Sequence, residues 1–171
     1  DNDGYLDLLI AGSTDDQEGQ ESGLRLLYNN GSGSFLNASS LLPDSLGSID
    51  QVDVADYDND GDVDIFLATS QGQIKLLRND GGNINNFLTI RLAGLRTGSS
   101  KNNYFGIGAK VEVKAGDLYQ VRYMEQPTAH FGLGNRDGAD VVRVLWSNGV
   151  PQNRFKPERN QTIVETQSLK G

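Results

Sequence analysis

The chain has 171 residues, of which 23 are acidic and 15 are basic, so its formal charge is −8. This balance argues against nucleic acid or an anionic membrane surface as a partner and favours cations. Cysteine is absent, which excludes disulfides, thiolate metal sites and cysteine nucleophiles. No apolar run approaches the roughly 20 residues that span a bilayer, so we expect no membrane insertion.

The first part of the chain contains a sequence repeat. Residues 1–11 align without gaps with residues 58–68, and residues 24–31 resemble residues 74–81. Each copy consists of an acidic loop, an apolar strand, a polar loop and a second strand that ends in Asn and Gly, which is typical of sequential antiparallel strands. Repeats of this length with short strands predict β-propeller blades, of which about one and a half are present.

The acidic loop at residues 56–64 has the residue types that a hard cation needs. Oxygen ligands alternate along it, and Gly61 stands where the backbone must turn sharply. A solvated turn without a cation would leave the repulsion between these carboxylates uncompensated. The spacing matches the start of an EF-hand, but Leu67 stands in place of the bidentate glutamate and the flanks are strands. We predict calcium, held by the carbonyl of Asp62 and the side chains of Asp56, Asp58, Asp60 and Asp64.

The start of the chain carries the other copy of this loop. Its predicted ligands are Asp1, Asp3, Tyr5 and Asp7. The counterpart of Asp56 would lie before Asp1, so we expect the chain to be a piece of a longer protein.

The repeat is lost from residue 83 onward, which predicts one domain over residues 1–82 and another over residues 83–171. Apolar and charged residues alternate within 110–114 and 142–146, as in strands with one wet face. The predicted strands of this region are 87–92, 109–114, 119–123, 141–146 and 162–166. We expect an all-β chain whose second domain is sandwich-like or barrel-like and has no helix longer than two turns. The side chains expected inside it are Val111, Val113, Val142, Val144 and Trp146.

Several other residues have a structural and a functional interpretation. His130 is the only histidine and is expected to be a structural residue at a strand end. The segments 106–108 and 132–134 resemble dinucleotide loops but lack the third glycine and the helix, so turns or close backbone approaches are expected. Core packing is favoured over sugar stacking for Trp146. The side chains expected in an exposed aromatic patch are Tyr104, Phe105 and Tyr123.

Residues 1–82 resemble the FG-GAP or VCBS repeat. The resemblance rests on D-x-D-x-D-G-x-x-D followed by an apolar strand, and on N-x-G-x-G-x-F at residues 29–35. It implies calcium-binding propeller blades like those of integrin α-subunits and bacterial surface proteins. The remainder resembles the ASPIC/UnbV domain that follows such repeats in cartilage acidic protein and bacterial relatives. The motifs that carry this resemblance lie at residues 106–113, 130–134 and 144–149.

We therefore expect a secreted or cell-surface adhesion or scaffold module without a catalytic centre, which binds a protein or glycan ligand. An accessory region of a larger secreted enzyme is the first alternative. Self-assembly through open strand edges is the second.

Overall fold

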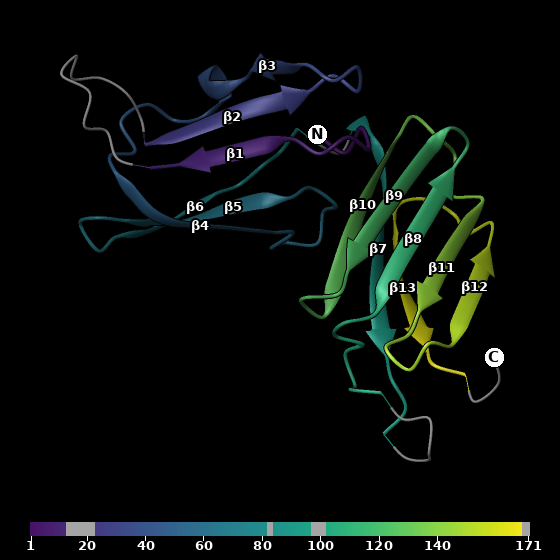
Figure 1. The fold of residues 1–171 in the computed structure, drawn as a ribbon. Coiled ribbons are helices and arrows are strands. Elements are labelled where there is room, and N and C mark those ends of the chain that lie inside the picture. The colour runs from purple at the N-terminus through teal and green to yellow at the C-terminus, as the bar shows by residue number, and fades with distance from the viewer. Residues whose placement is uncertain (13–22, 82–83, 97–101, 169–171) are drawn as a thin grey trace. The chain divides into compact units, whose positions relative to one another are not determined.

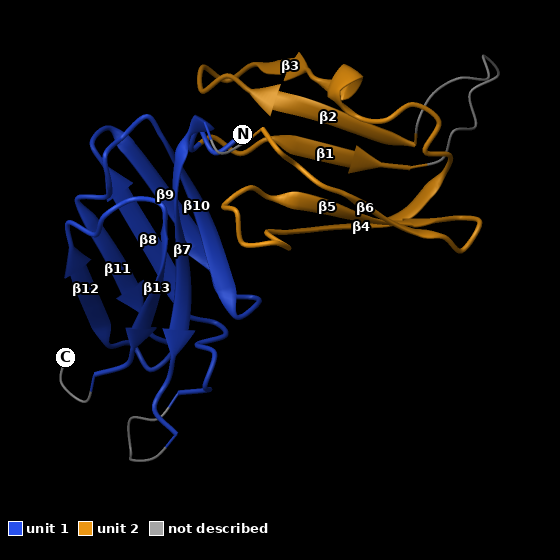
Figure 2. Ribbon diagram, turned by 180° about the vertical axis from the view of Figure 1, so that it is seen from behind, with its two compact units in different colours: residues 1–4, 83–171 blue, residues 5–82 orange. Residues whose placement is uncertain are grey.

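The computed structural model describes residues 1–12, 23–81, 84–96 and 102–168, and the chain divides into two compact units (Figure 2). One unit comprises Tyr5–Gly82, and the other joins Asp1–Gly4 to Asn83–Gly171. Nearly all regular structure is strand, no α-helix occurs within the described ranges, and the element η1 (Ser39–Leu41) is a 3-10 turn. The all-β prediction is confirmed.

The unit Tyr5–Gly82 contains two three-stranded antiparallel sheets (Figure 1). Their orders are β1-β2-β3 and β4-β5-β6. The two copies of the sequence repeat therefore supply the first strand of one sheet and the central strand of the other. The strands are β1 (Leu8–Ala11), β2 (Leu24–Asn29), β3 (Phe35–Asn37), β4 (Ile49–Ala55), β5 (Asp64–Thr69) and β6 (Ile74–Leu77).

A small apolar core joins these two sheets. Leu24 of β2 and Leu67 of β5 are almost fully buried in one cluster, because alternate residues of each strand point to the same face. The opposite faces are also apolar but are not covered: Ile10 of β1 is 48% exposed and Ile74 of β6 is 84% exposed. Each sheet thus presents one apolar face that the described residues leave open.

We predict that Leu67→Ala lowers the free energy of unfolding of the unit Tyr5–Gly82 by about 2 to 5 kcal/mol, because it opens a cavity in the small core. Ile74→Lys should change it by no more than about 0.5 kcal/mol, because that side chain already faces solvent. Urea unfolding followed by circular dichroism measures both. A large loss for Ile74→Lys would mean that another segment covers the face.

The other unit contains a three-stranded sheet, β10-β7-β13, and a four-stranded sheet, β12-β11-β8-β9 (Figure 1). Strand β13 pairs with β7 in parallel, and the other pairs are antiparallel. No sheet of the described strands closes into a barrel, so the sandwich-like alternative applies. The strands are β7 (Asn86–Ala93), β8 (Lys110–Ala115), β9 (Leu118–Tyr123), β10 (Thr128–Gly134), β11 (Val141–Leu145), β12 (Pro151–Phe155) and β13 (Gln161–Thr166).

The core of this unit lies between its two sheets. One cluster of buried side chains takes residues from both, with Phe131 of β10 and Trp146 as its largest members. The residues predicted to lie inside are all at most 1% exposed, and no α-helix occurs among the described residues of the unit. Both predictions are confirmed. The buried predicted residues are Val111, Val113, Val142, Val144 and Trp146.

Two strands were not predicted. Strand β10 includes Gly132, where an added Cβ would lie 2.6 Å from the backbone of Asn2, so the close-backbone interpretation of this glycine is correct. A register shift between Gly132 and Gly134 marks a bulge in the strand. Strand β12 escaped prediction because it lies at a sheet edge, where most of its side chains are exposed and no alternation appears.

Side chains join the two sheets of the sandwich where backbone ladders do not. On one side, Gln120 and Arg122 of β9 donate hydrogen bonds to the carbonyls of Gly132 and His130, at 2.7 and 3.0 Å. Burial lowers the pKa of the Arg122 guanidinium. These bonds connect β9 to β10 and satisfy backbone groups that would otherwise face an open edge.

The other side of the sandwich is closed by a buried carboxylate. Glu165 of β13 is 5% exposed and accepts hydrogen bonds from Arg154 and from Gln152 Nε2, the latter at 3.0 Å. Trp146 Nε1 donates to Gln152 Oε1 at 3.3 Å, which links this network to the core. A buried carboxylate of this kind is tolerated because its oxygens are satisfied.

His130 lies within β10, and both of its ring nitrogens are engaged. Nε2 is 2.7 Å from Asn2 Oδ1, and Nδ1 is 3.2 Å from Thr89 Oγ1. Because an amide oxygen only accepts, Nε2 carries the proton and Nδ1 accepts from the Thr89 hydroxyl. The ring stacks on Phe87 with centroids 5.3 Å apart. Burial, together with the charge of Arg122, lowers the pKa of His130 to about 4.

We predict a pH-dependent loss of stability from His130. Its folded pKa lies below the unfolded value of about 6.5, so the stability from the neutral ring is fully present above pH 6.5 and is lost as the pH falls toward about 4. The total contribution is about 3 kcal/mol. The measurement is the difference in thermal midpoint between the wild type and His130→Gln across this range. Carboxylates titrate in both proteins, so equal pH slopes would contradict the prediction.

Candidate metal centre

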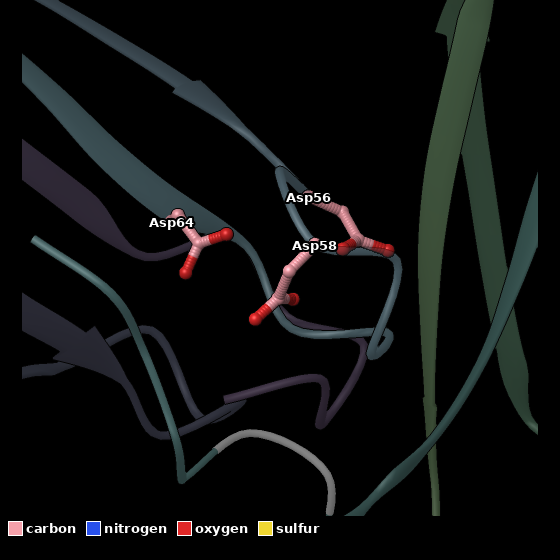
Figure 3. A group of neighbouring side chains, drawn as sticks. All are labelled: Asp56, Asp58 and Asp64. Atoms are coloured by element: carbon pink, nitrogen blue, oxygen red, sulfur yellow. The ribbon is translucent and has the colours of Figure 1, made fainter. Parts of the chain in front are cut away.

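Three carboxylates of the predicted calcium loop come together between β4 and β5. Asp56 follows β4 directly, Asp58 lies in the loop, and Asp64 is the first residue of β5 (Figure 3). One oxygen of each lies within 4.8 Å of the others. No other group of three potential metal-binding acids or histidines is found among the described residues.

The backbone of this loop turns through two residues with positive φ. Asn59 has φ 62° and Gly61 has φ 97°, a conformation that glycine adopts without steric cost and that asparagine tolerates. The turn directs backbone amides toward carboxylates: Gly61 N donates to Asp56 Oδ2 at 3.2 Å, and Asp62 N donates to Asp60 Oδ1 at 2.9 Å. These bonds orient the acidic side chains.

Asp64 connects the loop to a distant segment. Its Oδ2 accepts a hydrogen bond from Tyr57 N at 2.9 Å, and its Oδ1 accepts one from Asn79 N at 2.8 Å. The residue is fully buried, and each carboxylate oxygen still has acceptor capacity beyond these bonds. Asp64 therefore has a structural role that does not depend on a cation.

Asp56 provides the test of whether the site fits a metal. Its Oδ1 is buried and has no hydrogen-bond partner, although Oδ2 is bonded to Gly61. Burial raises the pKa of Asp56, the hydrogen bonds from Gly61 and Asn59 lower it in part, and the charges of Asp60 and Asp64 raise it further. An orphaned carboxylate oxygen beside further carboxylates is what a hard divalent cation would satisfy, so the residues fit calcium.

The other two predicted ligands of this loop, Asp60 and Asp62, do not belong to the group of three carboxylates. Asp60 is exposed and lies outside the group of three. Asp62 is fully buried, which the sequence did not predict. Ligation by the Asp60 side chain and the Asp62 carbonyl stays a prediction.

Sequence reasoning missed Arg78 as a neighbour of the loop. Arg78 Nη1 lies 3.7 Å from Asp58 Oδ2, and Nη2 lies 2.6 Å from Asp80 Oδ1. The Arg78 side chain is 57% exposed, so these ion pairs contribute little to stability. The sequence contained one indication of this contact: Arg78 stands at the end of the second repeated strand, at the position where the first copy has Tyr28.

The local geometry of the first acidic loop repeats that of the second. Asn2 and Gly4 have φ values of 60° and 98°, and Asp3 N donates to Asp1 Oδ1 at 3.1 Å. Asp7 Oδ1 accepts from Asn29 N at 2.8 Å, as Asp64 accepts from Asn79.

The first loop is divided between the two compact units. Asp1 and Asp3 belong to the unit with Asn83–Gly171, whereas Tyr5 and Asp7 belong to Tyr5–Gly82. Metal binding by these four residues stays a prediction.

Comparison with known families agrees with this geometry. Residues 1–67 match the family model of the FG-GAP-like repeat, and residues 98–170 match that of ASPIC and UnbV. The chain is therefore similar, over most of its length, to an FG-GAP-like repeat followed by an ASPIC/UnbV domain. Both predicted resemblances are confirmed, and a search of curated proteins found no match. FG-GAP repeats are typical of extracellular proteins, and within the described ranges no helix is long and apolar enough to cross a membrane.

The predicted aromatic residues are all exposed. Tyr104 and Phe105 are each 40% exposed and pack edge to face with ring centroids 5.1 Å apart. The guanidinium of Arg96 lies 4.1 Å above the Tyr104 ring. Tyr123 lies on β9 and is 65% exposed.

We predict that two aspartate variants separate structural from cation-dependent effects. Asp64→Asn should lower stability by about 1 to 3 kcal/mol even in chelator, because the amide has one accepting oxygen and its NH₂ group cannot accept, so one of the bonds from Tyr57 and Asn79 is lost. Asp58→Asn should change it by less than about 0.5 kcal/mol in chelator but remove the gain on adding calcium. Thermal unfolding with EDTA and with millimolar calcium measures both. Equal behaviour of the two variants in both buffers would disprove the distinction.

Proposed function

We propose that this chain is a calcium-stabilised, non-catalytic binding and scaffold module of an extracellular protein. The observation that carries the proposal is the carboxylate group of Asp56, Asp58 and Asp64, with the buried, unbonded Oδ1 of Asp56, inside the segment that matches the FG-GAP-like repeat. The three side chains would hold the ion. It would supply positive charge where desolvation and mutual repulsion otherwise oppose ionisation.

Calcium would act on the fold through the elements that the loop connects. The loop runs from β4 to β5, and Asp64 ties it to the segment after β6 through Asn79. Sites in extracellular modules bind calcium at roughly 0.1 to 1 mM, so millimolar calcium would stabilise the fold by about 0.4 to 1.4 kcal/mol. That magnitude suits a structural ion.

The chemistry of the remaining polar groups supports a non-catalytic role. The acidic side chains of the loop accept backbone hydrogen bonds, and both nitrogens of His130 are engaged with Thr89 and Asn2. A general base needs a nitrogen or oxygen that can reach a substrate proton. Binding through surfaces, rather than bond breaking, is the function these residues support.

The uncovered apolar faces of β1-β2-β3 and β4-β5-β6 support the propeller interpretation of the repeat. In a propeller, both faces of each blade are covered by neighbouring blades. We propose that further blades cover these faces and that the ASPIC/UnbV domain contacts a protein or glycan at the cell surface. Assembly with other copies through the same faces is the alternative.

Calcium titration by isothermal calorimetry tests the proposal. The wild type should bind one calcium ion in the Asp56 loop, and the double variant Asp56→Asn and Asp58→Asn should lose that binding. Asp50→Asn is the matched control for a single charge, because Asp50 is exposed on β4 and outside the group. Equal calcium binding by the double variant and the wild type would overturn the calcium assignment.

The non-catalytic part has its own test. The chain should not turn over polysaccharide or peptide substrates, and its partner binding should weaken in the loop variants only as far as the fold loosens. A hydrolytic activity that the double variant abolishes while circular dichroism shows an intact fold would refute this part.

A further inference from the structure

The outer face of the sheet β12-β11-β8-β9 carries a mixture of basic and aromatic residues. Alternate residues of β8 and β11 fill the core, so the residues between them face outward. Arg143 of β11 stands opposite Glu112 of β8 on this face, and Lys114 stands opposite Tyr119 of β9. Lys110 stands opposite Tyr123 in the same way.

This face is positive although the chain is acidic. The outward positions of the four strands hold three basic residues, Lys110, Lys114 and Arg143, against one acid, Glu112. Asp140 lies just before β11, where its carboxylate accepts from Gly116 N. A local positive surface on a chain of charge −8 indicates an anionic partner.

Glu112 is neutralised by its neighbours. Lys110 Nζ lies 2.6 Å from Glu112 Oε1, the Tyr119 hydroxyl donates to the same oxygen at 3.0 Å, and Arg143 Nε lies 3.7 Å from Oε2. The hydrogen bond from Lys110 is the largest of the effects that lower the pKa of Glu112. The carboxylate therefore stays ionised and organises the basic side chains around it, and together with Lys110 and Arg143 it forms a group of net positive charge.

A hollow of about 360 Å³ opens on this face. Its volume falls within the range of small-ligand sites, which is roughly 300 to 1,000 Å³. Five of its six lining residues carry a group that can donate or accept hydrogen bonds, and one is aliphatic, although apolar atoms make up more of the lining surface than polar atoms. The lining residues are Glu112, Lys114, Tyr119, Val141, Arg143 and Asn153.

We propose that this face binds an anionic polysaccharide, a deepening that rests on the proposed function as a binding module. The guanidinium of Arg143 and the ammonium of Lys114 pair with carboxylate or sulfate groups. The exposed rings of Tyr119 and Tyr123, 58% and 65% exposed, offer apolar surfaces for the C–H faces of sugar rings. Asn153 supplies an amide that can both donate to and accept from sugar hydroxyls.

The same features do not suit other anionic polymers. An acidic peptide gains affinity by adding a strand to a sheet edge or by anchoring apolar side chains in a pocket, and this hollow lies on the sheet face with one aliphatic lining residue. A nucleic acid carries a phosphate on every nucleotide, and this dense charge would be repelled by a chain whose net charge is −8 more strongly than the spaced charges of a polysaccharide such as hyaluronan. A hydroxyl-rich chain with spaced charges matches the lining best.

Binding of defined polymers to the full chain tests the proposal. The probes are hyaluronan, with carboxylates alone, and heparin, with carboxylates and sulfates; dextran is the neutral control. The wild type should bind at least one of the two anionic polysaccharides in biolayer interferometry. The comparison of the two shows which anion the face selects. The double variant Lys114→Gln and Arg143→Gln should bind at least tenfold more weakly, because each lost charged hydrogen bond costs about that factor.

Arg91→Gln is the control for the loss of one positive charge and is compared with the single variant Arg143→Gln, because Arg91 is exposed on β7 of the other sheet. It should bind as the wild type does. Tyr119→Phe keeps the ring and loses only the hydrogen bond to Glu112, whereas Tyr119→Ala also loses the ring, so the second should weaken binding more. Circular dichroism and thermal midpoints establish that each variant is folded.

Unchanged binding by the double variant, or equal binding of dextran, would overturn the proposal. Equal binding of polyglutamate or single-stranded DNA would also overturn it, in favour of an acidic peptide or a nucleic acid. Calcium titration of the same preparation keeps the proposed function separately testable. If the wild type binds polysaccharide but not calcium, only the calcium assignment is refuted. If it binds calcium but neither anionic polysaccharide, only this inference is refuted.

Discussion

Side chains of a strand point alternately to its two faces, so burial of the apolar residues on one face fixes which polar residues are exposed on the other. In the C-terminal unit, one face of β8 and β11 is sealed against the facing sheet by side chains such as Val113 and Val144. The polar residues between them are thereby forced outward as a group. In the N-terminal unit the described residues cover only one face of each sheet, by the small cluster around Leu24 and Leu67. The opposite faces also carry apolar side chains, and the described residues leave these side chains exposed.

The acidic loops show how one sequence pattern can serve a fold and a cation together. Asp64 and Asp7 each accept a backbone hydrogen bond from an asparagine, Asn79 or Asn29, near the end of a later strand. That bond lies beyond the last paired residues of the two strands, Leu8 with Leu27 or Ile65 with Leu77. Asp56 is different, because one of its oxygens has no partner inside the protein. The loop thus contains one acid, Asp64, whose hydrogen bonds stabilise the fold, and another, Asp56, whose free oxygen a cation would bind.

Polar side chains of the C-terminal unit form hydrogen bonds between strands of its two different sheets. Glu165 joins β13 to Gln152 and Arg154 of β12, and Gln120 and Arg122 join β9 to β10. These contacts lie at the open sides of the sandwich, where a backbone ladder cannot continue. Because a buried polar group without a partner is costly, such contacts also help to fix which sheet edges meet.

The sequence by itself determined what depends on local spacing. The repeated acidic pattern with Gly61 identified the loop, and the alternation around Val111 and Val144 identified core strands, because period and turn chemistry act over a few residues. It did not find β10, whose glycines suggested a turn, or β12, whose exposed edge position removes alternation.

Only the tertiary structure decided which distant groups meet. It brought Asn79 to Asp64 and Arg78 to Asp58, and it left one oxygen of Asp56 buried and unbonded. It also assembled the basic outer face, whose members come from different strands. Such pairings depend on strand register and sheet order, which are set by the burial of whole faces across the sheets and not by any short stretch of sequence.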